Sequence, residues 1–222
     1  MTYATRIGRL AALAVGLGVG AALAATPEVA SADDFQISID GMDLFPTTGN
    51  LATATSTMGD IAIAFGDGAN ATATDGTFDS AFADGANSTA YAGAGNFDSA
   101  YAIGDGSNAG VATGSGDTAF ANGTDAAALA GGVSVTDASG THVYAGNDDF
   151  SSALGPHTLA DSGAIMSETP SSNDIAMVFD PFGTVGSTAY AGAGNFDLAS
   201  VIGDMLHAAA EGNFMADILP SL

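Results

Sequence analysis

The chain has 222 residues and a formal net charge of −23, with 25 acidic side chains against 2 Lys or Arg. Such a surface repels the phosphates of nucleic acids and anionic lipids, so nucleic-acid binding is excluded, and it attracts metal cations and basic partners. The chain contains no Cys, and therefore has neither disulfides nor thiolate metal ligands.

The N-terminus has the three parts of a secretory signal peptide. Arg6 and Arg9 form a positively charged start, an apolar run follows, and small side chains precede a cleavage point after Ala32. A cut after Ala24 is the alternative. The apolar run is shorter than the roughly 20 residues that a membrane span needs. Residues 1–32 are therefore predicted to be a cleaved signal peptide.

Cleavage there would remove every Lys and Arg of the chain, because Arg6 and Arg9 are the only ones. The mature protein then lacks Schiff-base lysines, Walker-type phosphate loops and arginine clamps. A Ser-His-Asp triad is formally open to His142, His157 or His207, but no G-x-S-x-G motif accompanies them. We therefore expect a secreted or cell-envelope protein that is not an enzyme and, once cleaved, not an integral membrane protein.

Residues 33–51 are expected to form an N-terminal cap segment in front of a repeat that covers residues 52–130. The repeat can be written in lines of nineteen residues without a gap. A disordered chain drifts in spacing, whereas in a solenoid each coil lies on the previous one, so an inserted residue is costly. The recurring positions are Asp60, Asp79, Asp98 and Asp117; Ala62, Ala81, Ala100 and Ala119; Ala64, Ala83, Ala102 and Ala121; and Gly66, Gly85, Gly104 and Gly123.

Each line contains two short runs in which Ala alternates with another residue, separated by Gly, Asp and Asn. This pattern predicts two strands per coil and an all-β fold, a parallel β-roll or β-solenoid with nineteen-residue coils. Either the Ala columns or the large side chains between them face inward. We expect Ala inside, because unvarying small residues fit a narrow interior.

With Ala inside, the large side chains form an apolar stripe on the outside of the roll. Ile63, Phe82, Tyr101 and Phe120 make up this stripe. An apolar stripe on an acidic protein indicates a contact surface. Its cover is either residues 131–222 folded back across it, which we expect, or a second molecule.

The nineteen-residue register fails after Ala130, and residues 131–173 are expected to be an irregular insertion. The stretch Ser88–Asp105 then recurs ninety-nine residues later with fifteen of its eighteen residues unchanged. Residues 174–222 are therefore expected to hold diverged coils. Within them, apolar residues at helical spacing predict a short helix over Leu198–Glu211 that caps the stack.

The repeated aspartates are the most informative candidate site. Stacked carboxylates about 4.8 Å apart repel by roughly 1 kcal/mol for each neighbouring pair in water. Either solvent screens them and each accepts a turn N–H, or hard divalent cations such as Ca²⁺ bridge carboxylates and turn carbonyls. The candidate metal ligands are Asp60, Asp79, Asp98 and Asp117; no catalytic or cofactor-binding residue is expected, and no cofactor is required.

Three families share features with the chain. Turns such as Ile103–Asn108 resemble those in the β-roll heads of trimeric autotransporter adhesins, although those coils are typically shorter. Gly93–Asp98 is similar to the calcium-binding nonapeptide of repeats-in-toxin proteins, but lacks its doubled Gly, and Asp98 sits one place late. The phrases DLFPTTGN (Asp43–Asn50), GDIAIAFGDGANATA (Gly59–Ala73) and VFDPFG (Val178–Gly183) resemble secreted Ala/Gly/Asp-rich repeat proteins of mycobacteria. This last resemblance covers most of the mature chain and implies export and envelope association, without an activity.

Two hypotheses about function follow. The first is a secreted or envelope-associated, non-enzymatic repeat scaffold whose partner is a protein, an envelope component or a second copy of the chain. The alternative is an adhesin-like extracellular binding protein that needs Ca²⁺ to fold. The first predicts a folded roll in chelator, whereas the second predicts a disordered chain in chelator and strands with Ca²⁺.

Overall fold

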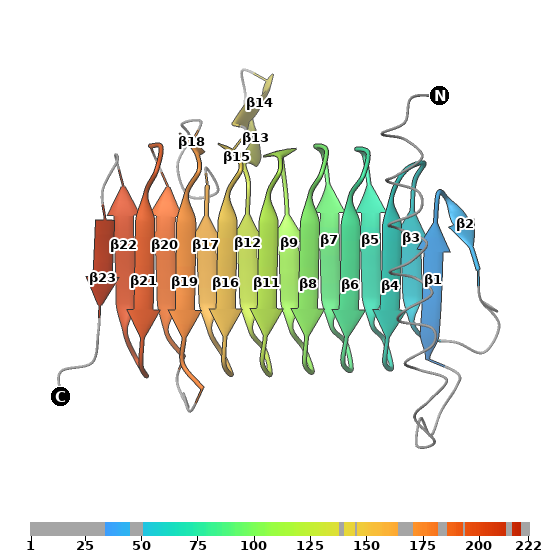
Figure 1. The fold of residues 1–222 in the computed structure, drawn as a ribbon, viewed down its shortest axis with the longest axis horizontal. Helices are drawn as coiled ribbons and strands as arrows, with labels where there is room; N and C mark the ends of the chain where they lie inside the picture. Colours follow the sequence, from blue (N-terminus) through green and yellow to red (C-terminus); the bar gives the residue numbers. More distant parts are fainter. Residues whose placement is uncertain are drawn as a thin grey trace, which may run out of the picture. The chain divides into compact units, whose positions relative to one another are not determined.

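The computed structural model describes residues 34–44, 51–137, 140–144, 146–163, 171–181, 186–192, 194–211 and 215–218. These residues form strands and turns, and no helix. Two large sheets contain most of the strands, and nearly all of their neighbouring strands run parallel (Figure 1). The prediction of an all-β fold with parallel sheets is therefore confirmed.

We call the larger sheet, of ten strands, sheet A, and the other, of eight strands, sheet B. In spatial order, sheet A contains β2 (Met42–Asp43), β1 (Phe35–Ile39), β4 (Ile61–Phe65), β6 (Ser80–Asp84), β8 (Ser99–Ile103), β11 (Thr118–Asn122), β16 (Phe150–Leu154), β19 (Ile175–Phe179), β21 (Leu198–Ile202) and β23 (Met215–Ile218). Sheet B contains β3 (Thr53–Ser56), β5 (Asn70–Thr74), β7 (Thr89–Gly93), β9 (Asn108–Val111), β12 (Ala127–Ala130), β17 (Leu159–Ser162), β20 (Thr188–Gly192) and β22 (His207–Glu211).

The chain alternates between the two sheets, so that one strand of each makes a coil. In sheet A, Ala62 pairs with Ala81, Ala81 with Ala100, and Ala100 with Ala119. Equivalent residues therefore lie in rows that cross the strands. A shift of one residue in any strand would turn its buried side chains to the outside, which explains the regular spacing of the sequence.

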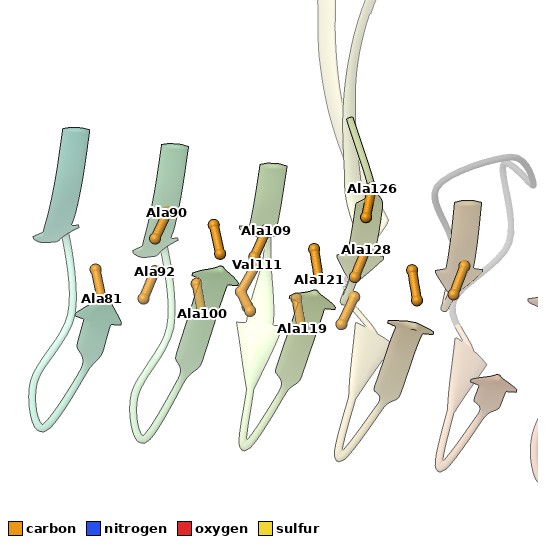
Figure 2. Packing of buried hydrophobic residues seen from close by; sticks show 14 of the residues in the cluster. Ala81, Ala90, Ala92, Ala100, Ala109, Val111, Ala119, Ala121, Ala126 and Ala128 are labelled. Atoms are coloured by element: carbon orange, nitrogen blue, oxygen red, sulfur yellow. The ribbon is translucent and has the colours of Figure 1, made fainter. Parts of the chain in front are cut away.

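The interior between the sheets is made almost entirely of alanine. Inward-facing Ala side chains from both sheets are buried, as Figure 2 shows for the middle coils. Large side chains alternate with them and point outward: Phe82, Tyr101 and Phe120 are only half-buried. Ile63, the first residue of the expected outer stripe, is instead buried, with an exposed fraction of 5%, where β4 pairs with β1. The structure thus has the orientation that we expected from the columns of Ala.

Glycine is required where consecutive coils turn closely over one another. Gly85 has a φ of +133°, and a Cβ there would lie 2.5 Å from the carbonyl carbon and oxygen of Gly104 in the next coil. Only glycine adopts this conformation without strain and leaves room for the neighbouring backbone. The repeated Gly column therefore reflects stacking of the coils.

The first coil is closed by polar side chains from an antiparallel strand. β1 runs antiparallel to β4 at the edge of sheet A. Gln36 Oε1 accepts a hydrogen bond from the N–H of Ala54 (2.9 Å), and the hydroxyls of Ser38 and Ser56 are hydrogen-bonded (2.9 Å). These buried groups satisfy backbone and side-chain partners at the end of the stack, as the expected cap segment should.

The segment 131–173 is more regular than its sequence indicates. It begins with an antiparallel hairpin, β13 (Val133–Asp137) and β14 (Gly140–Tyr144). It then returns to the roll, where β16 pairs with β11 and β17 pairs with β12, both in parallel. A third sheet of three short strands follows the turns: β10 (Gly114–Ser115), β15 (Gly146–Asn147) and β18 (Ser171–Ser172). The hairpin is thus an insertion between two coils, and the expected irregular segment contains a coil.

The expected helix over Leu198–Glu211 is wrong. β21 and β22 occupy this segment and pair in parallel with β19 and β20. The buried residues there alternate with a period of two within each strand, as Ala199 and Val201 show. The apparent helical spacing arose because a turn, with Gly203 at a φ of +127°, separates two short strands.

Candidate functional site: a buried row of aspartates

One turn of each coil places an aspartate inside the roll. The residue before this aspartate has a left-handed backbone, with φ of 99° at Gly59, 66° at Phe78 and Phe97, and 78° at Gly116. This conformation reverses the chain just before the strand of sheet A and directs the next side chain inward. The row comprises Asp60, Asp79, Asp98, Asp117, Asp149, Asp174 and Asp197, each with an exposed fraction of at most 1%.

Each aspartate is connected to the next coil by a hydrogen bond. The N–H of Asp79 donates to Oδ1 of Asp60 at 3.0 Å, and the N–H of Asp98 donates to Oδ1 of Asp79 at 2.9 Å. The same bond recurs through the other coils up to Asp197. The side chains therefore form a continuous ladder, in which one oxygen of each carboxyl satisfies a buried N–H.

The second oxygen of the middle aspartates differs from the first. Within the described part of the chain, Oδ2 of Asp79, Asp98, Asp117 and Asp149 has no hydrogen-bond partner. Asp60, at the start of the row, instead accepts a bond from the hydroxyl of Thr57 at 2.5 Å. An unpaired buried carboxylate oxygen costs on the order of 1–3 kcal/mol or more, so these groups need protons or cations.

Burial also changes the pKa of these carboxyls. Desolvation raises the pKa of Asp98 to about 7 and that of Asp117 to about 8, and the neighbouring carboxylates add to both shifts. Desolvation likewise raises the pKa of Asp149 to about 7. Hydrogen bonds from the next coil act in the opposite direction but do not compensate. Near neutral pH, the middle of the row is therefore partly protonated unless a cation replaces the protons.

All four aspartates predicted as metal ligands lie side by side in this row. The solvent-screening alternative is wrong, because the carboxyls are fully buried, and the N–H that each accepts comes from the next coil. Three other aspartates of the repeat lie outside this row: Asp67 and Asp105 are exposed, and Asp84 is half-buried. Among the described residues, no three His, Asp or Glu side chains converge as a metal centre made of such side chains alone would require.

Sequence reasoning missed three members of the row. Asp149, Asp174 and Asp197 follow the hairpin insertion and looser connections, so they break the nineteen-residue spacing. A local signal was present: Asn147-Asp148-Asp149 repeats the pattern of Asn96-Phe97-Asp98. Matching this turn pattern without a fixed spacing would have found Asp149 and Asp197, whereas Ser172-Asn173-Asp174 departs from it.

The same turns also present aromatic rings to solvent. Phe78 and Phe97 stack with their ring centroids 5.2 Å apart and an interplanar angle of 11°. Beside them, Thr77 donates to Oδ1 of Asn96 at 2.7 Å, and Ser115 accepts from the N–H of Asn96 at 3.1 Å. Thr77, Asn96 and Ser115 line an open groove along the turns. Asp75 lines the same groove, so this edge is polar with exposed rings.

Comparison of the chain with protein-family models, with curated proteins and with solved structures found no match. The described residues include no helix that is long and apolar enough to span a membrane.

Proposed function

We propose that the protein is a secreted or cell-envelope-associated, non-enzymatic scaffold that uses the outside of sheet A to bind a partner. Its building unit within residues 52–130 is one coil for every nineteen residues. The observation that carries the proposal is the stripe of Phe82, Tyr101 and Phe120, which points outward and is only half-buried. Large aromatic side chains on an acidic surface are typical of contact sites.

The described residues after Ala130 do not fold back across this stripe as we expected. β16 continues sheet A beside β11, and β19 and β21 follow in the same sheet (Figure 1). The described residues after Ala130 thus extend the stack. They also lengthen the apolar surface, because Met177, Phe179 and Ile202 on the outside of sheet A have exposed fractions of 38%, 47% and 42%. This arrangement favours a second molecule as the cover.

We also propose that the protein is not an enzyme, because of the side chains that it lacks. After signal cleavage it has no Lys, Arg, Cys or Trp. The buried carboxyls are enclosed by the coils and do not border a substrate cleft, which general acid–base catalysis would need. A hydrolase assay in which a single Asp or His substitution abolished activity would contradict this part of the proposal.

The outer stripe is tested by the double variant Phe82→Asp with Tyr101→Asp in the full-length chain. The matched control is Thr55→Asp with Thr72→Asp, a paired set on the outside of sheet B. Light scattering measures self-association, co-sedimentation measures binding to a cell-envelope fraction, and circular dichroism measures the melting temperature. We expect the stripe variant to lose association without a change in melting, and the control to keep both.

Two results would contradict the proposal. One is association by the stripe variant that equals the wild type. The other is a lowered melting temperature with unchanged association, because the stripe would then contribute to internal packing rather than to an interface.

The second candidate function is an extracellular binding protein that requires Ca²⁺. The unpartnered Oδ2 atoms of the middle aspartates favour it, because no Lys or Arg remains in the mature chain to neutralise them. Circular dichroism in chelator and with added Ca²⁺ separates the two candidates. A coil spectrum in chelator that converts to a strand spectrum with Ca²⁺ supports the second; a folded roll in chelator rejects it.

A further inference from the structure

The interior of the roll changes character in the coil formed by β16 and β17. One inward row of sheet A reads Ala100, Ala119, Ser151, Ala176 and Ala199 across consecutive strands. In sheet B, the inward residue that pairs with Ala191 is Ser162. Both serines are fully buried. Two inward positions that hold Ala in a neighbouring strand thus carry hydroxyls in the same coil.

Neither hydroxyl has a hydrogen-bond partner among the described residues. This holds for Oγ of Ser151 and of Ser162, and also for Oδ2 of Asp149 in the same coil. Asp149 lies two residues before Ser151 on the same inward face of the chain. Buried polar atoms that lack protein partners usually indicate a bound water or ion. Oδ1 of Asp161 in β17 is also buried without a partner, so this coil has four such atoms and is the most polar of the described coils.

Glycine backbones pack closely beside the two neighbouring carboxyls. A Cβ on Gly163 would lie 2.2 Å from the carbonyl oxygen of Gly131 and 2.6 Å from Oδ2 of Asp149, so these two oxygens lie close to each other beside Gly163. A Cβ on Gly131 would lie 2.8 Å from Oδ2 of Asp117. Only glycine fits at these positions, because a side chain would collide with the carbonyl and carboxyl oxygens.

We propose that this coil holds a divalent cation, with Ca²⁺ as the best fit, between Asp117 and Asp149. The available ligands are all oxygens: two carboxylates, one carbonyl and two hydroxyls. Ca²⁺ takes oxygen ligands at about 2.3–2.6 Å in irregular geometry, and softer metals prefer nitrogen or sulfur. The ligands are Asp117 Oδ2, Asp149 Oδ2, Gly131 O, Ser151 Oγ and Ser162 Oγ, and water completes the shell.

The charge of the site favours a cation over water alone. The two carboxyls belong to adjacent coils and are joined by the bond from the N–H of Asp149 to Oδ1 of Asp117, at 2.9 Å. Water would satisfy the hydroxyls but would leave two like charges in a poorly solvated interior. A divalent cation neutralises both, and its effect is strongest above the pH at which the carboxyls lose their protons.

The proposal goes beyond the binding role of sheet A and does not depend on it. It also differs from the second candidate function, in which the chain needs Ca²⁺ in order to fold. A protein that folds in chelator and still binds Ca²⁺ at this coil would reject the second candidate function and keep this site.

The test uses the full-length chain, unfolded in urea with chelator and refolded at pH 8 with or without Ca²⁺. Bound calcium is measured by mass spectrometry after gel filtration, and affinity by titration. The variants are Ser151→Ala with Ser162→Ala, which restores the alanines of the other coils and so should fold, and Asp149→Asn. The control is Asp98→Asn, a member of the same row in the coil of β8 and β9, where the buried inward positions of both strands are Ala or Val and the buried Ser107 lies in the turn between them.

We expect about one Ca²⁺ per wild-type chain and a loss of affinity of roughly tenfold or more in the serine and Asp149 variants. The control should bind as the wild type does. The absence of Ca²⁺ binding by the wild type at pH 8 would overturn the proposal, leaving water and protons in the site. Equal binding by the serine variant, or an equal loss in the control, would overturn it too, because binding would then be spread along the row.

Discussion

The N–H of Asp117 donates a hydrogen bond to Oδ1 of Asp98 at 3.1 Å, across the gap between two coils. The aspartates are therefore part of the hydrogen-bonding that stacks the coils, in addition to the strand pairing of sheets A and B. At the same time their second oxygens carry charge into the alanine interior. The row thus stabilises the stack through one oxygen and destabilises it through the other, and the balance depends on pH and cations.

Substitutions at Asp98 separate these two effects. Asn keeps an oxygen that can accept from Asp117 and removes the charge, so Asp98→Asn should be at least as stable as the wild type at pH 8 in chelator. Asp98→Ala leaves the buried N–H of Asp117 without its acceptor and should lose about 1–3 kcal/mol of unfolding free energy. Urea unfolding followed by circular dichroism measures both. An equal loss in the two variants would show that the charge itself stabilises the fold.

Stability in chelator should fall as the pH rises. The pKa of Asp117 is about 8 in the folded chain and that of Asp98 about 7, against a reference value of 3.8. Between about pH 4 and pH 8 the folded state keeps protons on these carboxyls that the unfolded state has already released. Unfolding therefore becomes more favourable with each added pH unit. The stabilising effect of protonation is complete below about pH 4 and is lost as the pH passes through 7 to 8.

Urea unfolding between pH 5 and pH 8.5 checks this pH dependence. The unfolding free energy of the Asp117→Asn variant should fall less steeply with pH than that of the wild type, because the variant lacks the carboxyl of Asp117, whose pKa is raised to about 8. A stability that increases over this range would show that the carboxyls are ionised and favourably solvated in the folded protein.

The alanine interior should not accept larger side chains. Ala100 is fully buried between strands, whereas Tyr101 beside it points outward. Ala100→Leu should therefore destabilise the chain by about 1–3 kcal/mol or more, because no space exists for three additional carbons. Tyr101→Leu, the matched change on the outside, should cost less. The melting temperatures of the two variants test this expectation. A greater decrease in Tyr101→Leu than in Ala100→Leu would indicate that the face of the sheet with Tyr101 is the interior.

Two glycines offer another matched pair. A Cβ on Gly95 would lie 1.5 Å from the carbonyl oxygen of Gly114, which is backbone and cannot move without separating two coils. A Cβ on Gly110 would lie 3.1 Å from the end of the Leu129 side chain, which can rotate away. Gly95→Ala should thus prevent or severely weaken folding, and Gly110→Ala should be tolerated. Similar unfolding midpoints for the two variants would contradict the close stacking at the aspartate turn.

Much of the fold could be predicted because its physical constraints are local and repeated. Alternating Ala, a turn Gly and an Asp in each line specify the strands, the turn and the inward side chain of one coil. The second part of the stack was harder to predict, because the hairpin at 133–144 moves Asp149 to thirty-two positions after Asp117 although the two lie in adjacent coils. Spacing along the chain then no longer reports position in the stack.

The chemistry of the site was only partly readable from the sequence. The row of aspartates was visible as a column, but its complete burial depends on how the turn directs the side chain, which follows from the left-handed residues before it. Ser151 and Ser162 gave no signal of their own, since they differ from the rows of Ala only once the two strands are placed in register. The proposed role of the two serines depends on residues that lie near them only in the folded chain.

The stacking of the coils, on which the buried row and the outer stripe both depend, can be measured directly by electron paramagnetic resonance. The chain has no Cys, so Thr53→Cys with Thr188→Cys allows two spin labels without other changes. The two residues belong to the same row of sheet B, with β5, β7, β9, β12 and β17 between their strands. At about 4.8 Å for each step, the labelled backbone positions should lie about 29 Å apart with a narrow distribution. A broad distribution centred near roughly 60 Å, as for a flexible chain of this length, would contradict the stacked roll.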